Sequence, residues 1–209
     1  MNSAPVYFFP NRMRRIVLLA MEEILGHEEA NAVINLSDLT NHIDRYPAYN
    51  QDLKFPFEHI SRLQTVLERT YGPRAGRGLS LRVGRACLKY GLREFGSELG
   101  LTNLDFRLLP LPTRIKVGCE ALAGLFNQYT GQRIRLEVDK KHIIWNIERC
   151  PLCWERQADD PCCTLAVGLL QEALYWVSGG KTFLVEEKKC IACGDLTCTM
   201  VIDRTPIPF

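Results

Sequence analysis

The sequence predicts an α+β fold: an antiparallel sheet of about four strands packed against several helices, with a helical extension at the N-terminus. Before residue 130, apolar residues recur mostly with the spacing of amphipathic helices. After residue 132 the pattern changes to alternation of apolar and polar residues, which is typical of half-buried strands. Helices and strands that are separated along the chain in this way indicate an α+β domain.

The first helical segment covers residues 12–36, and Gly26 divides it into a helical pair. A polar, proline-containing stretch over 37–56 follows and predicts a connecting loop. With 209 residues, one domain plus an extension is favoured over two full domains. We therefore expect an N-terminal helical extension at 1–55 and the main domain at 56–209.

Three more helices precede the strands, and the predicted ranges are 57–71, 79–99 and 112–129. The glycine-rich stretch 72–80 resembles a phosphate-binding loop, but no Gly-Lys-Ser/Thr follows and no strand precedes it. We predict a plain loop there. Cys87 and Cys119 fall on apolar helical stripes, so both are expected to fill the core.

The strands form two hairpins around one central helix. The predicted strands are 133–138, 143–147, 182–187 and 198–203, and the helix begins at Pro161 and ends before Gly179. Gly194 and Asp195 give the second hairpin its turn signal.

Composition excludes several classes of protein. A formal net charge of +2 with 24% charged residues offers no excess of positive charge to a phosphate backbone, so no direct nucleic-acid partner is expected. No run of about 18 apolar residues could span a membrane. The N-terminal apolar run is interrupted by Glu22 and Glu23 and lacks a cleavage site, so we expect a cytoplasmic protein.

The cysteines are unevenly distributed. Seven of the nine lie in the 49 residues from Cys150 to Cys198, where an even spread would place about two. A reducing compartment disfavours disulfides and favours metal binding or thiol chemistry. All seven follow or precede a predicted element, where sulfur is available for a site.

A metal site can be built from these residues. Closing the second hairpin brings Cys190 opposite Cys198, with Glu187 within reach. The partial positive charge of a helix N-terminus lowers the pKa of Cys162 or Cys163 and favours thiolate. Three thiolates and one carboxylate suit a structural Zn²⁺ site.

Other interpretations of the cysteines remain open. Cys150-Pro-Leu-Cys153 is a second candidate donor pair, and it also resembles the start of a dithiol redox motif. An iron–sulfur cluster could use Cys150 and Cys153 with Cys190 and Cys198. Core filling by all of these cysteines is the plainest alternative.

The C-terminal pattern of Glu187-x-x-Cys190, Gly194-Asp195 and Cys198 resembles the signature of the 4-vinyl reductase domain family. The resemblance extends upstream through CPLCWERQADDPCC and GLLQEALYWVSGG. It implies a dimerising α+β domain that binds small molecules, related in fold to vesicle-tethering subunits.

The resemblance also implies a zinc site, and its ligands map onto Cys163, Glu187, Cys190 and Cys198. Cys162 competes with Cys163 for the first position, because the spacing to Glu187 fits neither perfectly. Cys193 departs from the family pattern, which leaves open a swapped ligand or a cluster in place of zinc.

We therefore expect a protein that binds or senses a hydrophobic or aromatic small molecule and carries a structural metal site, with a homodimer as its assembly. Aromatic residues suited to lining such a pocket are Phe126, Trp145, Tyr175, Trp176 and Phe183. The alternative is a thiol-redox or iron–sulfur-dependent reductase, as in tetrapyrrole metabolism. The chain shows no dinucleotide-binding fingerprint to supply a hydride, and no catalytic residue is assigned.

Overall fold

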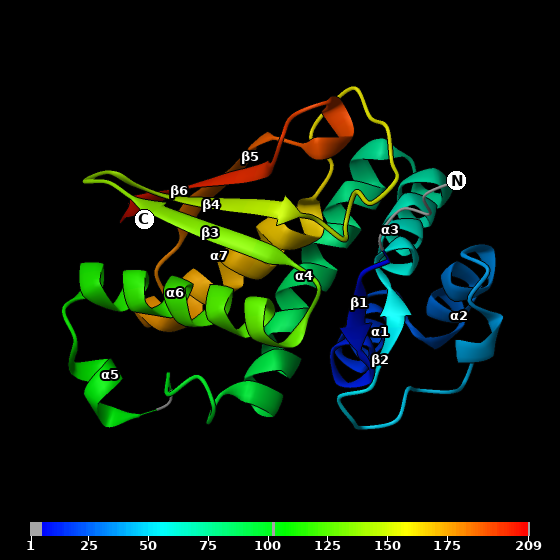
Figure 1. Ribbon diagram of the computed structural model, residues 1–209, viewed down its shortest axis with the longest axis horizontal. Helices are drawn as coiled ribbons and strands as arrows, with labels where there is room; N and C mark the ends of the chain where they lie inside the picture. Colours follow the sequence, from blue (N-terminus) through cyan, green and yellow to red (C-terminus); the bar gives the residue numbers. More distant parts are fainter. Residues whose placement is uncertain (1–5, 102, 209) are drawn as a thin grey trace.

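The computed structural model describes residues 6–101 and 103–208. In these residues seven α-helices accompany a four-stranded antiparallel sheet and a separate two-stranded one, which confirms the predicted α+β class and the four antiparallel strands (Figure 1). The helices are α1 (Asn11–Leu25), α2 (His27–Leu36), α3 (Phe57–Tyr71), α4 (Pro73–Phe95), α5 (Leu104–Leu108), α6 (Leu111–Tyr129) and α7 (Thr164–Ser178). The strands are β1 (Phe8–Pro10), β2 (Leu53–Pro56), β3 (Arg133–Val138), β4 (His142–Arg149), β5 (Phe183–Lys189) and β6 (Cys198–Pro206), and two 3₁₀ turns, η1 (Thr40–His42) and η2 (Ile191–Cys193), complete the chain.

The four-stranded sheet has the order β3-β4-β6-β5, with every neighbouring pair antiparallel. Its alternating apolar residues, among them Ile143, Trp145 and Ile147, are buried on one face. Helices α6 and α7 cover that face, with α6 beside β3 and α7 beside β5 (Figure 1). The register sets Cys198 opposite Ile147, so the start of β6 lies next to the chain that leaves β4.

Helix α4 is longer than the sequence predicts, because its first turns include the stretch 72–80 that we expected to be a loop. Pro73 stands in the first turn of the helix, where a missing N–H costs nothing. Gly76 packs against the end of α3 so closely that a Cβ there would lie 2.5 Å from the carbonyl oxygen of Leu67. This glycine therefore permits helix packing and forms no phosphate loop.

Glycines also allow α4 and α7 to pack closely against each other in the middle of the molecule. A Cβ on Gly84 would lie 2.0 Å from the carbonyl oxygen of Leu165, and a Cβ on Gly168 would lie 2.0 Å from that of Leu81. Only hydrogen atoms at both positions allow the two backbones this approach. The crossing fixes where the N-terminus of α7 points.

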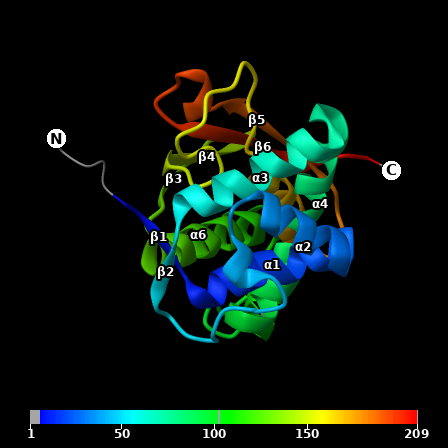
Figure 2. The ribbon, with the colours of Figure 1, turned by 90° about the vertical axis from the view of Figure 1, so that its right-hand side faces the viewer.

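The N-terminal part of the chain contains a strand pair that the sequence does not predict. Strand β1 pairs with β2, with Phe9 opposite Phe55 and Phe8 opposite Pro56, so β2 crosses the expected boundary between residues 55 and 56. Helix α1 lies against α4, and Figure 2 shows α1 and α2 beside α3 and α4. The division at residue 55 stays a prediction.

Across the part of the chain that the structure describes, we find no helix that combines the length and the apolar character needed to cross a membrane.

Candidate functional site

An apolar cavity of about 110 Å³ lies between α1, α4, α6, α7 and the inner face of the sheet. Its walls are almost entirely aliphatic and aromatic, with the amide of Gln132 as the exception. Gln132 itself is 9% exposed. Burying apolar surface is the main favourable term that such a space offers a ligand.

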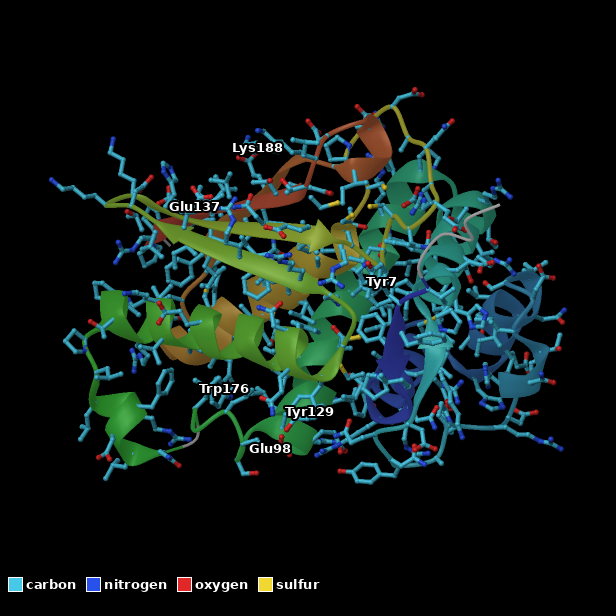
Figure 3. All side chains as sticks on the ribbon, in the orientation of Figure 1. Tyr7, Glu98, Tyr129, Glu137, Trp176 and Lys188 are labelled. Carbon is cyan, nitrogen blue, oxygen red and sulfur yellow. The ribbon has the colours of Figure 1, made fainter. Side chains whose placement is uncertain are left out.

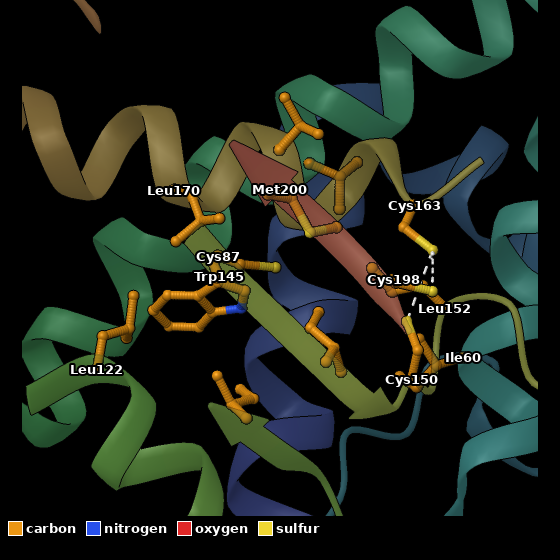
Figure 4. Packing of buried hydrophobic residues seen from close by; sticks show 14 of the residues in the cluster. Ile60, Cys87, Leu122, Trp145, Cys150, Leu152, Cys163, Leu170, Cys198 and Met200 are labelled. Carbon is orange, nitrogen blue, oxygen red and sulfur yellow. Dashed lines mark hydrogen bonds between the residues drawn. The ribbon is translucent and has the colours of Figure 1, made fainter. Parts of the chain in front are cut away.

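The aromatic residues that the sequence suggested for a pocket lie in different places. Trp145, on β4, and Phe126, on α6, both line the cavity. Figure 4 shows the Trp145 ring beside Leu122 and Leu170, two other residues of the wall. Tyr175 lies outside the wall with 49% of its surface exposed. Contact of any of the three with a ligand stays a prediction.

Cys87 and Cys119 are buried, and neither lies within the groups of side chains that could hold a metal. Burial raises the pKa of each thiol to about 12, because a low-dielectric surrounding disfavours the thiolate. Both are therefore neutral thiols at neutral pH.

A second feature lies at the end of the sheet, where six buried cysteines meet. We call them the cysteine cluster: Cys150, Cys153, Cys162, Cys163, Cys190 and Cys198, each no more than 1% exposed. Four short segments contribute them, namely the loop after β4, the N-terminus of α7, the turn before η2 and the first residue of β6. Figure 3 shows the yellow sulfur atoms gathered where these segments meet.

The sulfur atoms of the cluster lie within contact distance of one another. Cys163 Sγ is 3.5 Å from Cys150 Sγ, 3.7 Å from Cys198 Sγ and 3.9 Å from Cys190 Sγ. Cys198 Sγ is also 3.3 Å from Cys153 Sγ and 3.9 Å from Cys190 Sγ. The sulfurs of Cys150, Cys163 and Cys198 converge in Figure 4.

Glu187 extends from β5 into the edge of the cluster. One carboxylate oxygen, Oε2, accepts a hydrogen bond of 2.7 Å from the backbone N–H of Cys163. The other, Oε1, is buried without a hydrogen-bond partner. Burial, and then the negative charge of Cys190, raise the pKa of Glu187 to about 8.

The sulfurs of Cys190 and Cys198 accept hydrogen bonds, but of these two only Cys190 has a lowered pKa, because the hydrogen bond with Cys150 raises the pKa of Cys198. The N–H of Ile191 donates to Cys198 Sγ at 3.3 Å. Hydrogen bonds from the neighbouring thiols, with Cys153 first, hold the pKa of Cys190 far below that of an ordinary thiol. Thiolate is the form of cysteine that binds metal.

The residues that the sequence assigned to a metal occupy one of two overlapping groups. Cys163, Glu187, Cys190 and Cys198 present one ligand atom each, all within 4.8 Å of one another. Cys150 and Cys153 form a second such group with Cys163 and Cys198. Binding of a metal by either group stays a prediction.

The two remaining candidate metal ligands, Cys162 and Cys193, lie outside both groups. Cys162 Sγ is 3.8 Å from Cys190 Sγ but belongs to neither group. Cys193 is exposed. The sequence reasoning missed that Cys163 and Cys198 belong to both groups, and no local pattern could have signalled it, because the sharing depends on how four segments pack.

The cavity and the cluster are neighbours. Pro151 and Leu152 line the cavity, and they stand between Cys150 and Cys153 in the chain. Residues of the first turns of α7, beginning at Leu165, line the same cavity. One loop and one helix start therefore form both sites.

No protein-family model and no curated protein matches this sequence. Solved structures do match. The phenol-responsive sensory domain of the transcription activator PoxR, solved with phenol, is 20% identical over 69% of this chain and 72% of that one, with a TM-score of 0.51. An H-NOX structure from work on heme distortion is 15% identical over 96% and 97%, with a TM-score of 0.60. The Fe(II) unliganded H-NOX protein from K. algicida is 10% identical over 96% and 97%, with a TM-score of 0.58.

These matches correct two predictions. Membership of the 4-vinyl reductase domain family is wrong, because the matching structures are H-NOX domains and a phenol-responsive domain. The cysteine signature and the upstream stretches that suggested the family are short motifs, which do not by themselves define a family. The predicted cofactors, zinc or an iron–sulfur cluster, are contradicted as well, because the cofactor named for matching H-NOX structures is heme. At 10–20% identity, the chain shares its fold with H-NOX domains and with a phenol-responsive sensory domain.

Proposed function

We propose that this protein is a sensory domain that binds a small, mostly apolar molecule about one aromatic ring in size. The apolar cavity of about 110 Å³ is the observation that carries the proposal. A cavity on the order of 150 Å³ with similar aliphatic and aromatic walls binds benzene in an engineered protein. The shared fold with a domain that responds to phenol supports the same class of ligand.

The chemistry of the walls selects the ligand. Charged molecules are disfavoured, because a buried ion without a partner loses its hydration and gains nothing in return. The Gln132 amide and the indole N–H of Trp145 are the polar side-chain groups of the wall that are best suited to bond a ligand hydroxyl. We therefore expect simple aromatic hydrocarbons and phenols to bind, and their carboxylated analogues to bind far less.

Heme, the cofactor of matching H-NOX structures, does not fit the cavity of this chain. Protein ligands to heme iron are histidine, thiolate, methionine or tyrosine side chains. The described wall contains no histidine or tyrosine, and its cysteine, Cys87, is a neutral thiol whose pKa is raised to about 12. Met13 alone remains, and the wall has no basic residue to bind a propionate. We derive no role for heme in this protein.

The ligand proposal is tested by filling the cavity from one wall. Gly91, on α4, lines the cavity, and a Cβ there would meet no atom within 4 Å. Gly124, on α6, is equally open but lies on the exposed surface outside the wall. Gly91→Phe should therefore occupy the space that a ligand needs, and Gly124→Phe should leave it free.

Toluene and phenol are the probes, with benzoate for comparison. Titration calorimetry of the unmodified protein should show saturable binding of toluene and phenol. Gly91→Phe should weaken that binding at least tenfold, and Gly124→Phe should leave it unchanged. Equal binding by the two variants, or no saturable binding by the unmodified protein, would refute the proposal.

We also propose that the cysteine cluster holds a thiophilic cation, with Cys163, Glu187, Cys190 and Cys198 among its ligands. The convergence of these four ligand atoms within 4.8 Å supports it. Buried cysteines at turns and helix ends, beside a buried carboxylate, are typical of a site for a soft cation. Cadmium binding by metal-free protein, lost in Cys198→Ser, is the expected result. A homodimer stays a separate prediction, to be tested by sedimentation.

A further inference from the structure

We propose that the cysteine cluster binds two cations and not one, with the thiolates of Cys163 and Cys198 bridging them. This inference rests on the proposed function of the cluster as a metal site and adds its nuclearity and ligand assignment. Cys150 and Cys153 complete the coordination of one cation. Glu187 and Cys190 complete that of the other.

The two groups of ligand atoms carry the proposal. Each contains four atoms within 4.8 Å of one another, the number that a tetrahedral cation requires. Cys163 and Cys198 appear in both groups. Two tetrahedra that share one edge are the geometry of a pair of cations bridged by two sulfurs.

The distances fit this geometry. A metal–sulfur bond of about 2.3 Å in a tetrahedral thiolate site places neighbouring sulfurs about 3.8 Å apart. The shared edge, from Cys163 Sγ to Cys198 Sγ, measures 3.7 Å. Cys190 Sγ lies 3.9 Å from both of them, which makes a near-regular triangular face on the side of Glu187.

The group that contains Cys150 and Cys153 is slightly tighter. Cys150 Sγ lies 3.5 Å from Cys163 Sγ, and Cys153 Sγ lies 3.3 Å from Cys198 Sγ. Each terminal cysteine thus pairs with a different bridging sulfur, and all four sulfur atoms lie within 4.8 Å of one another. Expansion of these contacts by a few tenths of an ångström gives a regular site.

A single cation leaves this cluster incompletely explained. If it took Glu187 and Cys190 with the shared sulfurs, Cys150 and Cys153 would remain as buried thiols crowded against the ligands. If it took Cys150 and Cys153, the buried Oε1 of Glu187 would remain without a partner. Buried polar groups are seldom left unpaired. Two cations give all six ligand groups a partner.

The charge balance is compatible with two cations and does not by itself distinguish them from one. Five thiolates and one carboxylate carry six negative charges, whereas the four ligands of a single cation carry four. Two divalent cations reduce the excess to about two charges, in a place where α7 presents its N-terminus and Ile191 donates its N–H to Cys198. Each thiol releases its proton to solvent on binding.

The test uses ¹¹³Cd²⁺ as the probe, in full-length protein with the exposed Cys193 changed to Ser so that it cannot add a third ion. Protein stripped of metal under reducing conditions is titrated and examined by native mass spectrometry. Two cadmium ions per chain are expected. One per chain overturns the binuclear assignment and leaves the metal site, whereas none overturns both.

The bridge has its own signature. ¹¹³Cd nuclear magnetic resonance should show two signals split by coupling between the two ions, because the bridging sulfurs connect them through two bonds. Two uncoupled signals would overturn the bridging assignment. This measurement needs no substitution in the cluster, so it does not depend on whether a variant folds.

Variants then assign the two positions. Cys153→Ser should retain the cation bound by Glu187 and Cys190, and Glu187→Gln should retain the one bound by Cys150 and Cys153. Each variant should bind one cadmium ion tightly, with the second at least 100-fold weaker, and circular dichroism verifies that it is folded. Two tightly bound ions in a folded variant would contradict the ligand assignment.

Discussion

Gly84 and Gly168 decide, as single residues, how closely α4 and α7 pack. At either position a methyl group would lie 2.0 Å from a backbone carbonyl oxygen of the facing helix, and backbone cannot move aside as a flexible side chain can. A protein interior at this density has no room for the extra atom. This steric clash is specific to Gly84 and Gly168, and it does not apply to every glycine in a helix.

We predict that Gly84→Ala destabilises the protein by about 1–3 kcal/mol, the usual cost of overpacking a core. Gly124→Ala is the matched control, because its Cβ meets nothing within 4 Å and its helix should gain about 0.5–1 kcal/mol. Urea unfolding of both variants measures the difference. Equal free energies of unfolding would show that the two helices do not cross as closely as described.

Two histidines make the N-terminal helices sensitive to acid. His42 is half-buried, with Nε2 3.3 Å from Nη1 of Arg14, and His59 packs against Phe55. Burial lowers the pKa of both side chains, and the charge of Arg14 lowers that of His42 further. In the folded state they are therefore neutral at a pH where the unfolded chain binds protons.

At such a pH the unfolded state holds more protons than the folded state. The contribution of the two neutral histidines to the free energy of unfolding is therefore complete above about pH 6.5, and it is lost as the pH falls through their lowered folded pKa. We predict that the double variant His42→Gln, His59→Gln loses part of its acid sensitivity between pH 7 and 5. Thermal unfolding across that range measures it. A slope against pH identical to that of the unmodified protein would exclude these residues as the cause.

At the scale of elements, the segment Cys150-Pro-Leu-Cys153 connects the two candidate sites. Leu152 is 5% exposed and lines the cavity, while the cysteines on either side of it turn into the cluster. A short loop held at both ends by buried sulfur positions its apolar side chains firmly. The cavity wall here should be more rigid than a surface loop.

We predict that Leu152→Ala enlarges the cavity, lowers stability by about 2–5 kcal/mol and shifts binding toward ligands larger than toluene. Cadmium stoichiometry should not change, because the ligand atoms come from the neighbouring residues. Leu196→Ala, at a residue that is 94% exposed near the cluster, is the control. A parallel loss of cadmium in Leu152→Ala would indicate that the loop has unfolded and not merely opened the cavity.

The elements differ in how far the sequence predicted them. Strands β3 to β6 were predictable because alternation along a strand is a local pattern that reports which face is buried. Strands β1 and β2, of three and four residues with prolines, carry too few residues for any period to appear. The start of α4 was mistaken for a loop because glycine usually disfavours helix, and the facing helix that requires it is distant in sequence.

At the scale of the whole molecule, the N-terminal residues contribute to the cavity as well as to the outer layer. Phe9, Met13 and Ile16 line the cavity, and β1 is paired through β2 with the chain that enters α3. Deletion of residues 1–55 would expose this wall to solvent. The described residues thus form a core that is continuous across the proposed boundary.

We predict that deletion of residues 1–55 abolishes saturable binding of toluene and lowers the unfolding midpoint of any protein that remains folded. Cadmium stoichiometry at the cluster, which draws all its ligands from residues after 149, should survive in a folded deletion variant. Calorimetry and native mass spectrometry measure the two properties. Undiminished toluene binding would place the ligand elsewhere.

The sequence by itself determined the α+β class, the four antiparallel strands, most of the helices and the presence of a sulfur-rich region at the ends of elements. These features can be predicted because they follow from local periodicity and from residue type, both of which are visible in the sequence. Tertiary structure alone decided that Cys163 and Cys198 belong to two ligand groups at once, and that Phe126 and Trp145 share one cavity wall with residues near the N-terminus. Such relations arise because packing brings together atoms whose separation along the chain carries no signal.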